Sequence, residues 1–304
     1  MIVTLDKIIN ELKGLGSAGE EIAIRNQIDL LLIRDLKWES LSVRLRERHL
    51  GFNKYISTIV YIASILNSLD IQFIFIKLFR NYPFLDSNID ILIPHEKWGC
   101  VFELLKRDGW TLPNLFGVLK QNLIEKGKIK LYSKRKKYLP LHFYETGSWR
   151  GFEYLPLKVI YNNSISLKDY GVEIKIPNKE MEFLISTAHA VFENYELTLG
   201  ELYYLNEIKN TTIISNNIAQ KQRWIKALRL VLDIVEEFSQ MDVEQILKTR
   251  WPLLLPIEKL RKCWIERCNT QSNKDNIASG YIEFITHLFW CWVIRSYRKH
   301  KYKW

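Results

Sequence analysis

The chain has 304 residues, and 44 Lys and Arg against 34 Asp and Glu give it a formal net charge of +10 at pH 7. Hydrophobic residues make up 47% and charged residues 26%, which excludes a disordered chain, while 13 Gly and 8 Pro exclude a collagen-like or low-complexity one. A chain of this length usually forms about two domains. The positive excess predicts an acidic partner, which is a nucleic acid, an anionic membrane surface or a phosphorylated small molecule.

The sequence carries no sign of export. Its four cysteines form no CxxC pair, which favours free thiols in a reducing compartment. The N-terminal segment is an acidic amphipathic helix rather than a basic stretch followed by an apolar run, so it does not resemble a signal peptide. No apolar stretch is long enough to span a bilayer. We therefore expect a cytoplasmic protein.

Residues 1–69 are predicted to form a helical N-terminal extension. Three glycines between residues 14 and 19 separate a first helix from a second over residues 20–47. A third helix is expected over residues 53–69. Apolar residues recur at helical spacing in each of them.

Residues 70–176 change to the pattern of a mixed α/β domain. Short β-rich runs alternate with turn signals, and a helix over residues 95–107 ends at Gly109. The predicted strands cover residues 71–76, 88–93, 129–133, 138–144 and 172–176, and residues 145–156 are predicted to be a loop-rich crossover. The fold class is therefore expected to be α+β (mixed α/β), with a small sheet flanked by helices.

Residues 177–304 are predicted to form a helical C-terminal domain. Asn178 opens a helix that runs to Tyr195, and Thr198 with Glu201 forms a capping box at the start of the next. A last, Trp-rich helix is expected over residues 276–297, followed by a basic aromatic tail. Packing in the core of this domain is the favoured role of that helix. A homo-oligomer contact is an alternative, and an interfacial membrane anchor is a weaker one.

The chemistry-bearing residues gather around the second predicted strand. Asp86, Asn88 and Asp90 stand at every second position, so they share one face if the strand extends that far back. Carboxylates on one face beside a loop suit Mg²⁺, which binds oxygen ligands and bridges nucleotide phosphates. Asp90 and Asp86 are therefore the metal-ligand candidates. Lys77 is either a phosphate-side lysine or a strand-end lysine that faces solvent.

This segment resembles the nucleotidyltransferases of the polymerase-beta-like superfamily, in particular an uncharacterised archaeal and bacterial branch. In that branch a strand ending Leu-Lys-Gly precedes an Asp-hydrophobic-Asp strand, and here the matching residues are Ile76-Lys77-Leu78 and Asn88-Ile89-Asp90. Residues 141–156 and 176–205 are similar to later segments of the family.

The resemblance implies Mg²⁺-dependent transfer of a nucleotidyl group from a nucleoside triphosphate (NTP) to an acceptor. It implies catalytic roles for Asp90, Asn88 and Asp86, and nucleotide contacts from Lys77 and Arg80.

The sequence departs from the family pattern at three places. Asn88 stands at the first aspartate, Leu78 stands at the loop glycine, and the later strand offers His142 or Pro140 where a third carboxylate is expected. Asn is a neutral, weaker ligand and His binds Mg²⁺ poorly. Glu145 is a possible substitute. Two functions therefore stay open: an active enzyme, or a catalytically degenerate fold that binds RNA or a ribonucleoprotein surface.

Two basic runs contain no acidic residue and together hold more positive charge than the net charge of the chain. Their phosphate-binding candidates are Lys126, Lys128, Lys130, Lys134, Arg135, Lys136 and Lys137 in the first run and Arg295, Arg298, Lys299, Lys301 and Lys303 in the second. Such runs suit the phosphate backbone of RNA. The alternative for the first run is a solvated hairpin whose lysines protect a sheet edge from aggregation.

Overall fold

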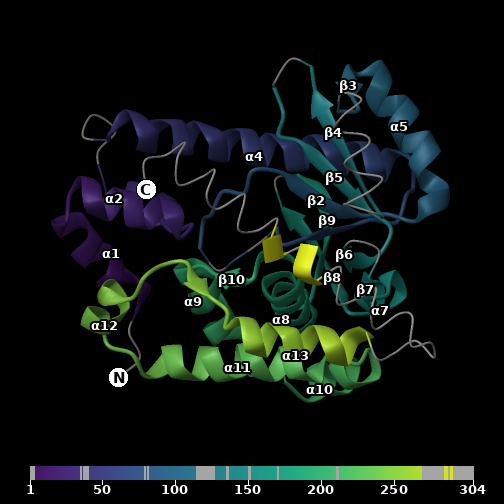
Figure 1. The fold of residues 1–304 in the computed structure, drawn as a ribbon. Coiled ribbons are helices and arrows are strands. Elements are labelled where there is room, and N and C mark those ends of the chain that lie inside the picture. The colour runs from purple at the N-terminus through teal and green to yellow at the C-terminus, as the bar shows by residue number, and fades with distance from the viewer. Residues whose placement is uncertain are drawn as a thin grey trace.

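The computed structural model describes residues 4–34, 36, 41–78, 80, 82–113, 127–134, 137–149, 152–169, 171–209, 212–268, 284–286, 288 and 289. In these residues helices and a small mixed sheet alternate, which confirms the α+β class (Figure 1). The second basic run and most of the predicted last helix lie outside the described residues. No described helix combines the length and the apolar character that crossing a membrane requires.

Four helices form the N-terminal part of the chain. They are α1 (Leu5–Gly14), α2 (Ser17–Arg25), α3 (Asp29–Arg34) and α4 (Val43–Ser68). The single helix expected over residues 20–47 is thus wrong, because Gln27 adopts a left-handed φ of 59° between α2 and α3. Ser42 begins α4 by accepting a hydrogen bond from the Leu45 N–H at 3.2 Å, so residues 43–47 belong to the long helix.

The central sheet has five strands in the order β1-β2-β5-β4-β3. They are β1 (Ile74–Ile76), β2 (Ile89–Leu92), β5 (Leu141–Tyr144), β4 (Lys128–Ser133) and β3 (Trp110–Thr111). Strands β2 and β5 are parallel, and every other neighbouring pair is antiparallel. The helix α5 (Trp98–Arg107) follows β2, as the sequence predicted.

The two faces of this sheet differ in polarity because side chains alternate along each strand. Ile89, Ile91 and Phe143 are buried on one face, where the Phe143 ring meets Phe102 of α5 edge-on, with ring centroids 5.5 Å apart. Asp90 and His142 occupy the other face. Figure 1 shows the long helix α4 running beside the sheet and the C-terminal helices on the far side of the molecule.

A stretch predicted as a loop-rich crossover is a hairpin. Strands β6 (Gly147–Trp149) and β7 (Phe152–Leu155) pair with each other, and α7 (Leu157–Asn162) follows them. A second hairpin joins β8 (Ser164–Asp169) to β9 (Val172–Pro177). Strand β9 lies beside β1, so this hairpin stands next to the end of the sheet where Lys77 emerges.

The C-terminal part is helical, as expected. Helix α8 (Lys179–Ala188) continues into a π-helical turn (His189–Asn194), and α9 (Leu199–Ile208), α10 (Thr212–Lys221), α11 (Ile225–Gln240), α12 (Val243–Lys248) and α13 (Ile257–Cys268) follow. Strands β10 (Glu196–Leu197) and β11 (Leu253–Leu254) form a short pair. The predicted capping box of Thr198 and Glu201 is confirmed at α9.

The N-terminal helices dock on this helical part. Asn26, after α2, accepts hydrogen bonds from the Leu199 N–H at 3.0 Å and, through its backbone carbonyl, from the Gly200 N–H at 3.2 Å. A Cβ atom at Gly200 would lie 2.4 Å from the Tyr82 hydroxyl and 2.6 Å from the Asn26 carbonyl oxygen, so only glycine permits this approach. The contact brings together the end of α2, the start of α9 and the loop after β1.

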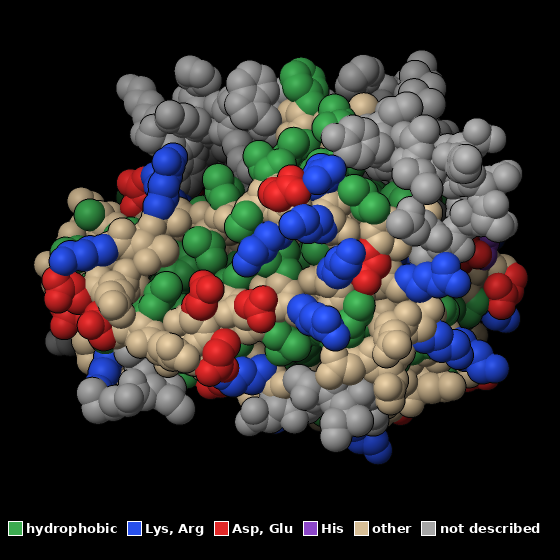
Figure 2. All heavy atoms as spheres, turned by 60° about the horizontal axis from the view of Figure 1, so that its bottom comes forward, with side chains coloured by type: hydrophobic (Ala, Val, Ile, Leu, Met, Phe, Trp, Pro, Cys, Tyr) green, Lys and Arg blue, Asp and Glu red, His purple; other side chains and the backbone are tan. Residues whose placement is uncertain are grey.

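Charges of both signs are mixed on one face of the molecule. On the face shown in Figure 2, Lys and Arg side chains are interspersed with Asp and Glu and with hydrophobic side chains. Mixed charge of this kind produces no strong field of one sign. The positive excess is therefore not gathered into a single patch on this face.

Candidate functional site

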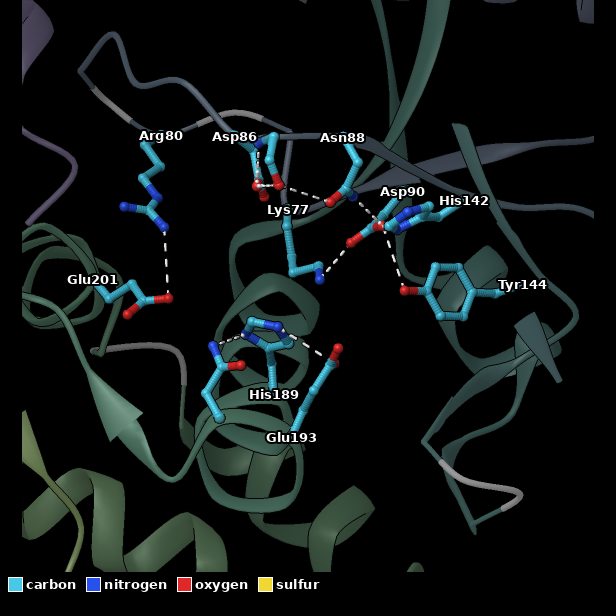
Figure 3. A network of polar contacts seen from close by, with 12 residues as sticks. Lys77, Arg80, Asp86, Asn88, Asp90, His142, Tyr144, His189, Glu193 and Glu201 are labelled. Carbon is cyan, nitrogen blue, oxygen red and sulfur yellow. Dashed lines mark hydrogen bonds and ion pairs between the residues drawn. The ribbon is translucent and has the colours of Figure 1, made fainter. Parts of the chain in front are cut away.

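The centre of the candidate site is the carboxylate of Asp90 on β2, which four donors surround (Figure 3). The Lys77 ammonium forms an ion pair with Oδ2. Oδ1 accepts from Asn88 Nδ2 at 2.6 Å, from His142 Nδ1 at 3.1 Å and from the Tyr144 hydroxyl at 3.4 Å. Because an ionised carboxylate only accepts hydrogen bonds, His142 carries its proton on Nδ1.

The pairing of β2 with β5 produces this arrangement. In the parallel register Asp90 stands beside His142, and Leu92 beside Tyr144, so these side chains share the polar face of the sheet. The Asp90 side chain keeps only 3% of its surface exposed, whereas Lys77 keeps 17% and His142 keeps 10%. A ligand can therefore reach Lys77 and His142 from solvent, but it reaches Asp90 only by displacing them.

Charge pairing fixes the ionisation of the central groups. Burial alone would raise the pKa of Asp90, but Lys77 and the hydrogen bond from His142 hold it well below its usual range. Burial lowers the pKa of Lys77, and the facing Asp90 carboxylate outweighs this and raises it above the usual value. Burial and the nearby Lys128 lower the pKa of His142, so its ring is neutral at pH 7. The site thus holds an ammonium and a carboxylate in contact.

Lys77 reaches Asp90 because the backbone turns sharply after β1. Its φ is 57°, in the left-handed region that a non-glycine residue rarely adopts. The Tyr55 hydroxyl of α4 donates to the Leu78 carbonyl at 3.0 Å, and the Glu182 carboxylate of α8 accepts a hydrogen bond from the Lys77 N–H. Leu78, at the glycine position of the family pattern, is buried in the core.

The π-helical turn after α8 contributes a second polar pair. His189 Nε2 lies 3.3 Å from Glu193 Oε2, and Asn194 Nδ2 lies 3.4 Å from His189 Nδ1. The pKa of His189 is lowered by burial and by Lys77, so the neutral ring donates from Nε2 and accepts at Nδ1. Figure 3 shows this pair facing the Lys77 ammonium from the helical part of the molecule. π-helical turns of this kind often occur at functional sites.

The first basic run supplies two lysines to the same sheet face. Lys128 stands opposite Tyr144 and Lys130 opposite His142 in the antiparallel register of β4 and β5. Lys128 is 9% exposed, and its Nζ lies 5.0 Å from the centre of the Tyr144 ring. The alternation of Lys128, Ile129, Lys130 and Leu131 is the sequence signal that could have placed both lysines on the face opposite the core.

The other members of the first run lie elsewhere. Lys134 and Lys137 are exposed near the end of β4, whereas Lys126, Arg135 and Lys136 lie outside the described residues. The nucleic-acid contacts of both runs therefore stay a prediction. For Lys128 the structure gives a buried position that a polymer backbone does not reach without movement of the side chain.

Arg80 belongs to a separate cluster. Its guanidinium donates to the Tyr82 hydroxyl at 2.7 Å, lies 3.7 Å from a Glu201 carboxylate oxygen and is stacked 4.3 Å from the centre of the Phe84 ring. Figure 3 shows Arg80 and Glu201 on the opposite side of Lys77 from Asp90. Of the two residues predicted to contact nucleotide, only Lys77 touches Asp90.

Asp86 stands outside the strand, because β2 begins at Ile89. Its carboxylate accepts a hydrogen bond from the Ser87 N–H at 2.6 Å. Asn88 does turn toward Asp90, and its Oδ1 accepts from the Ser87 hydroxyl at 3.2 Å. Glu145 is half exposed and lies 3.7 Å from His95. Asp86 and Asp90 are thus joined through Ser87 and Asn88 rather than facing a common point.

A pair of catalytic Mg²⁺ ions does not fit these side chains. Within the described part of the chain, no three His, Cys, Asp or Glu side chains converge in a way that would hold a metal ion. Both Asp90 oxygens already accept from Lys77, Asn88 and His142, and a divalent cation would have to displace the lysine that neutralises them. Such ions need several oxygen ligands, and the amide of Asn88 and the ring of His142 are poor replacements.

Comparison with known proteins gives weak structural similarity. No family model and no curated protein sequence matches the chain. A lincosamide antibiotic adenylyltransferase, LnuA, in its lincomycin-bound crystal structure, is similar with a TM-score of 0.37 and 13% identity over 51% of this chain and 97% of that one. An antigenic nucleotidyltransferase-like protein from Paracoccidioides brasiliensis is similar with a TM-score of 0.38 and 14% identity over 64% of this chain and 98% of that one.

Proposed function

We propose that the chain is a nucleotidyltransferase-like protein that binds the phosphates of a nucleoside triphosphate with lysines instead of a two-metal centre. One observation carries the proposal. Lys77 and Asp90, two positions on which the family resemblance depends, meet at one sheet face with His142, which stands where the family has a third carboxylate, and Lys128 shares that face.

Lys128 is the strongest candidate for a phosphate contact. Burial lowers its pKa, and the Glu193 and Asp90 carboxylates act in the opposite direction. A phosphate beside it would add negative charge next to this buried ammonium, and an ammonium binds phosphate as a point charge. Lys130 shares this face, and Lys77 is open enough to solvent to join the contact.

Two-metal nucleotidyl transfer is not part of the proposal. The Asp90 carboxylate already accepts from four side chains, so a metal ion could bind it only by displacing Lys77. The role that suits this arrangement is to hold Lys77 and His142 in place. Asp90 is then a positioning residue, and the lysines are the binding residues.

The test is equilibrium binding of ATP, CTP, GTP and UTP to the full chain, in EDTA and in excess Mg²⁺. We expect binding of at least one nucleotide to persist in EDTA and to weaken about tenfold in Lys128→Met, the scale of one lost charge-assisted contact. Lys134→Met removes an exposed lysine of the same run and should change nothing.

Two results would overturn the proposal. One is that no nucleotide binds under either condition. The other is Mg²⁺-dependent transfer of a labelled nucleotidyl group that Asp90→Asn abolishes, because this would show that a metal centre forms after all. A cooperative melting transition of Lys128→Met at pH 7 shows that the variant folds, so that a loss of nucleotide binding is not a loss of folding.

A further inference from the structure

A cavity lies behind the loop that carries Lys77. It has a volume of about 520 Å³, within the usual range of small-molecule sites. Its walls come from the residues after β1, from the β8–β9 hairpin and from helices α8 and α9. Asp90, His142 and Lys128 do not line it, so it is distinct from the site described above.

The cavity combines an apolar wall with two deep ionisable groups, Arg80 and Glu182. Ile165, Ile176 and Ile208 form much of the apolar surface, and Lys179 and Glu207 are exposed at its edge. Glu182 of α8 also lines the cavity and is only 6% exposed. A mostly apolar pocket with a few convergent polar groups is the usual form of a ligand site.

The negative charge of Glu182 is poorly compensated. Burial raises the pKa of its carboxyl to about 7, although Arg80, the Lys77 ammonium and the Lys77 N–H lower it. Arg80, which also lines the cavity, already donates to the Tyr82 hydroxyl and pairs with Glu201. A buried carboxylate whose charge is poorly compensated favours a bound cation, because the attraction to the cation offsets the hydration that the carboxylate lost on burial.

We propose that this cavity binds a small organic amine with an apolar body, whose ammonium pairs with Glu182 and whose body packs against Ile165, Ile176 and Ile208. Arg80 and Lys179 also line the cavity, but Arg80 already pairs with Glu201, and Lys179 is exposed at the edge. An organic anion would compete with Glu201 for Arg80 and would lie beside the buried Glu182 carboxylate. A purely apolar molecule would leave the charge of that carboxylate uncompensated.

The proposal does not depend on nucleotide binding, although the two sites are adjacent. Glu182 accepts the N–H of Lys77, and the ammonium of the same lysine pairs with Asp90. An amine bound to Glu182 would therefore lie next to Lys77, which belongs to the proposed nucleotide site. The affinity for the amine can be measured directly, without nucleotide.

The experiment titrates the full chain with 1-hexylamine, 1-hexanol and hexanoate as probes of equal length and different charge. Calorimetry gives the affinities, and amide chemical shifts locate the binding. We expect hexylamine to bind about tenfold more tightly than hexanol, and hexanoate to bind most weakly. Glu182→Gln should abolish the preference for the amine, because glutamine keeps the shape and the acceptor for the Lys77 N–H but lacks the charge.

Two further variants keep the test decisive. Glu180→Gln removes a carboxylate of the same helix that does not line the cavity and should leave the preference unchanged. Ile165→Trp enlarges a side chain that is 46% exposed, so it should obstruct the cavity without disturbing the core and should weaken all three probes. Equal affinity for hexylamine and hexanol, absence of binding, or a preference that survives Glu182→Gln would each overturn the proposal.

Discussion

Asp90 and Glu182 both contact Lys77 and are buried to a similar degree, at 4% and 6% exposure, yet their ionisation differs. Asp90 accepts from four donors, one of them the Lys77 ammonium, and its pKa lies well below the usual range. Glu182 accepts the Lys77 N–H, and burial outweighs the effect of Arg80 and Lys77 and raises its pKa to about 7. Burial is equal, so the donors around each carboxylate decide its charge.

The difference separates two kinds of region. The polar sheet face around Asp90 is already compensated, so a new cation there has to compete with Lys77. The cavity around Glu182 is under-compensated, so a new cation there gains a partner. A buried carboxylate thus disfavours a metal ion at Asp90, whereas at Glu182 it is the group that we propose pairs with an amine.

Breaking the ion pair between Lys77 and Asp90 should have the largest effect on stability. Lys77→Met leaves a buried carboxylate without its cation and should cost about 3–5 kcal/mol of unfolding free energy at pH 7. The Asp90 pKa is depressed in the fold, so its contribution is present above the unfolded pKa and is lost as the pH falls through the folded one. In the variant the Asp90 pKa rises, and the deficit should shrink toward pH 4.

Urea unfolding of Lys77→Met at pH 7 and pH 4 measures this effect. Lys248→Met is the control, because it breaks the Lys248–Glu244 pair, in which both side chains are 74% exposed, and should cost less than about 0.5 kcal/mol. A deficit of equal size at both pH values would contradict the ionic explanation.

Neutralising the other carboxylate should have the opposite sign. Glu182 binds its proton more tightly in the folded than in the unfolded chain, so its ionisation destabilises the fold as the pH rises from about 4.5 to about 7. Glu182→Gln should therefore stabilise the protein by about 3 kcal/mol at pH 8 and by less than about 1 kcal/mol at pH 5. Thermal unfolding at the two pH values measures it, and a destabilised variant at pH 8 would show that the carboxylate is well compensated.

Removing a single hydrogen-bond donor to Asp90 should have the smallest effect on stability. Tyr144→Phe removes the long hydrogen bond of 3.4 Å and should cost about 0.5 kcal/mol. Asn88→Ala removes the short one of 2.6 Å and should cost more, about 1.5 kcal/mol. Chemical denaturation of the two variants gives both losses of unfolding free energy. A larger loss in Tyr144→Phe than in Asn88→Ala would mean that the length of these hydrogen bonds does not decide their strength.

Local sequence signals predicted much of the fold. The β-rich runs over residues 71–76 and 88–93 contain β1 and β2, and Thr198 with Glu201 caps α9 as its residue types require. The break between α2 and α3 was missed, because Gln27 takes a left-handed φ without a glycine or proline to signal it. The β6–β7 hairpin was missed for a similar reason, since short strands within a loop-rich segment leave little periodicity.

The candidate site was predicted only in part. Asp90, Asn88 and Lys77 were found from spacing and do meet, whereas Glu193 gave no signal, because a π-helical turn places it and helical periodicity does not reveal such a turn. Lys128 was assigned to a nucleic-acid surface from composition, although the alternation along its strand places it on the polar face of the sheet.

The sequence by itself determined which residues are polar, where positive charge is concentrated and where most of the strands and helices lie, because these depend on side-chain chemistry and local periodicity. Only the tertiary structure decided that Asp90 lies beside His142, since parallel pairing joins segments far apart in the chain. It also decided that Lys77 contacts Asp90 with its ammonium and Glu182 with its amide. The charge of a buried group depends on its neighbours in space, and those neighbours come from β1, β5 and α8 together.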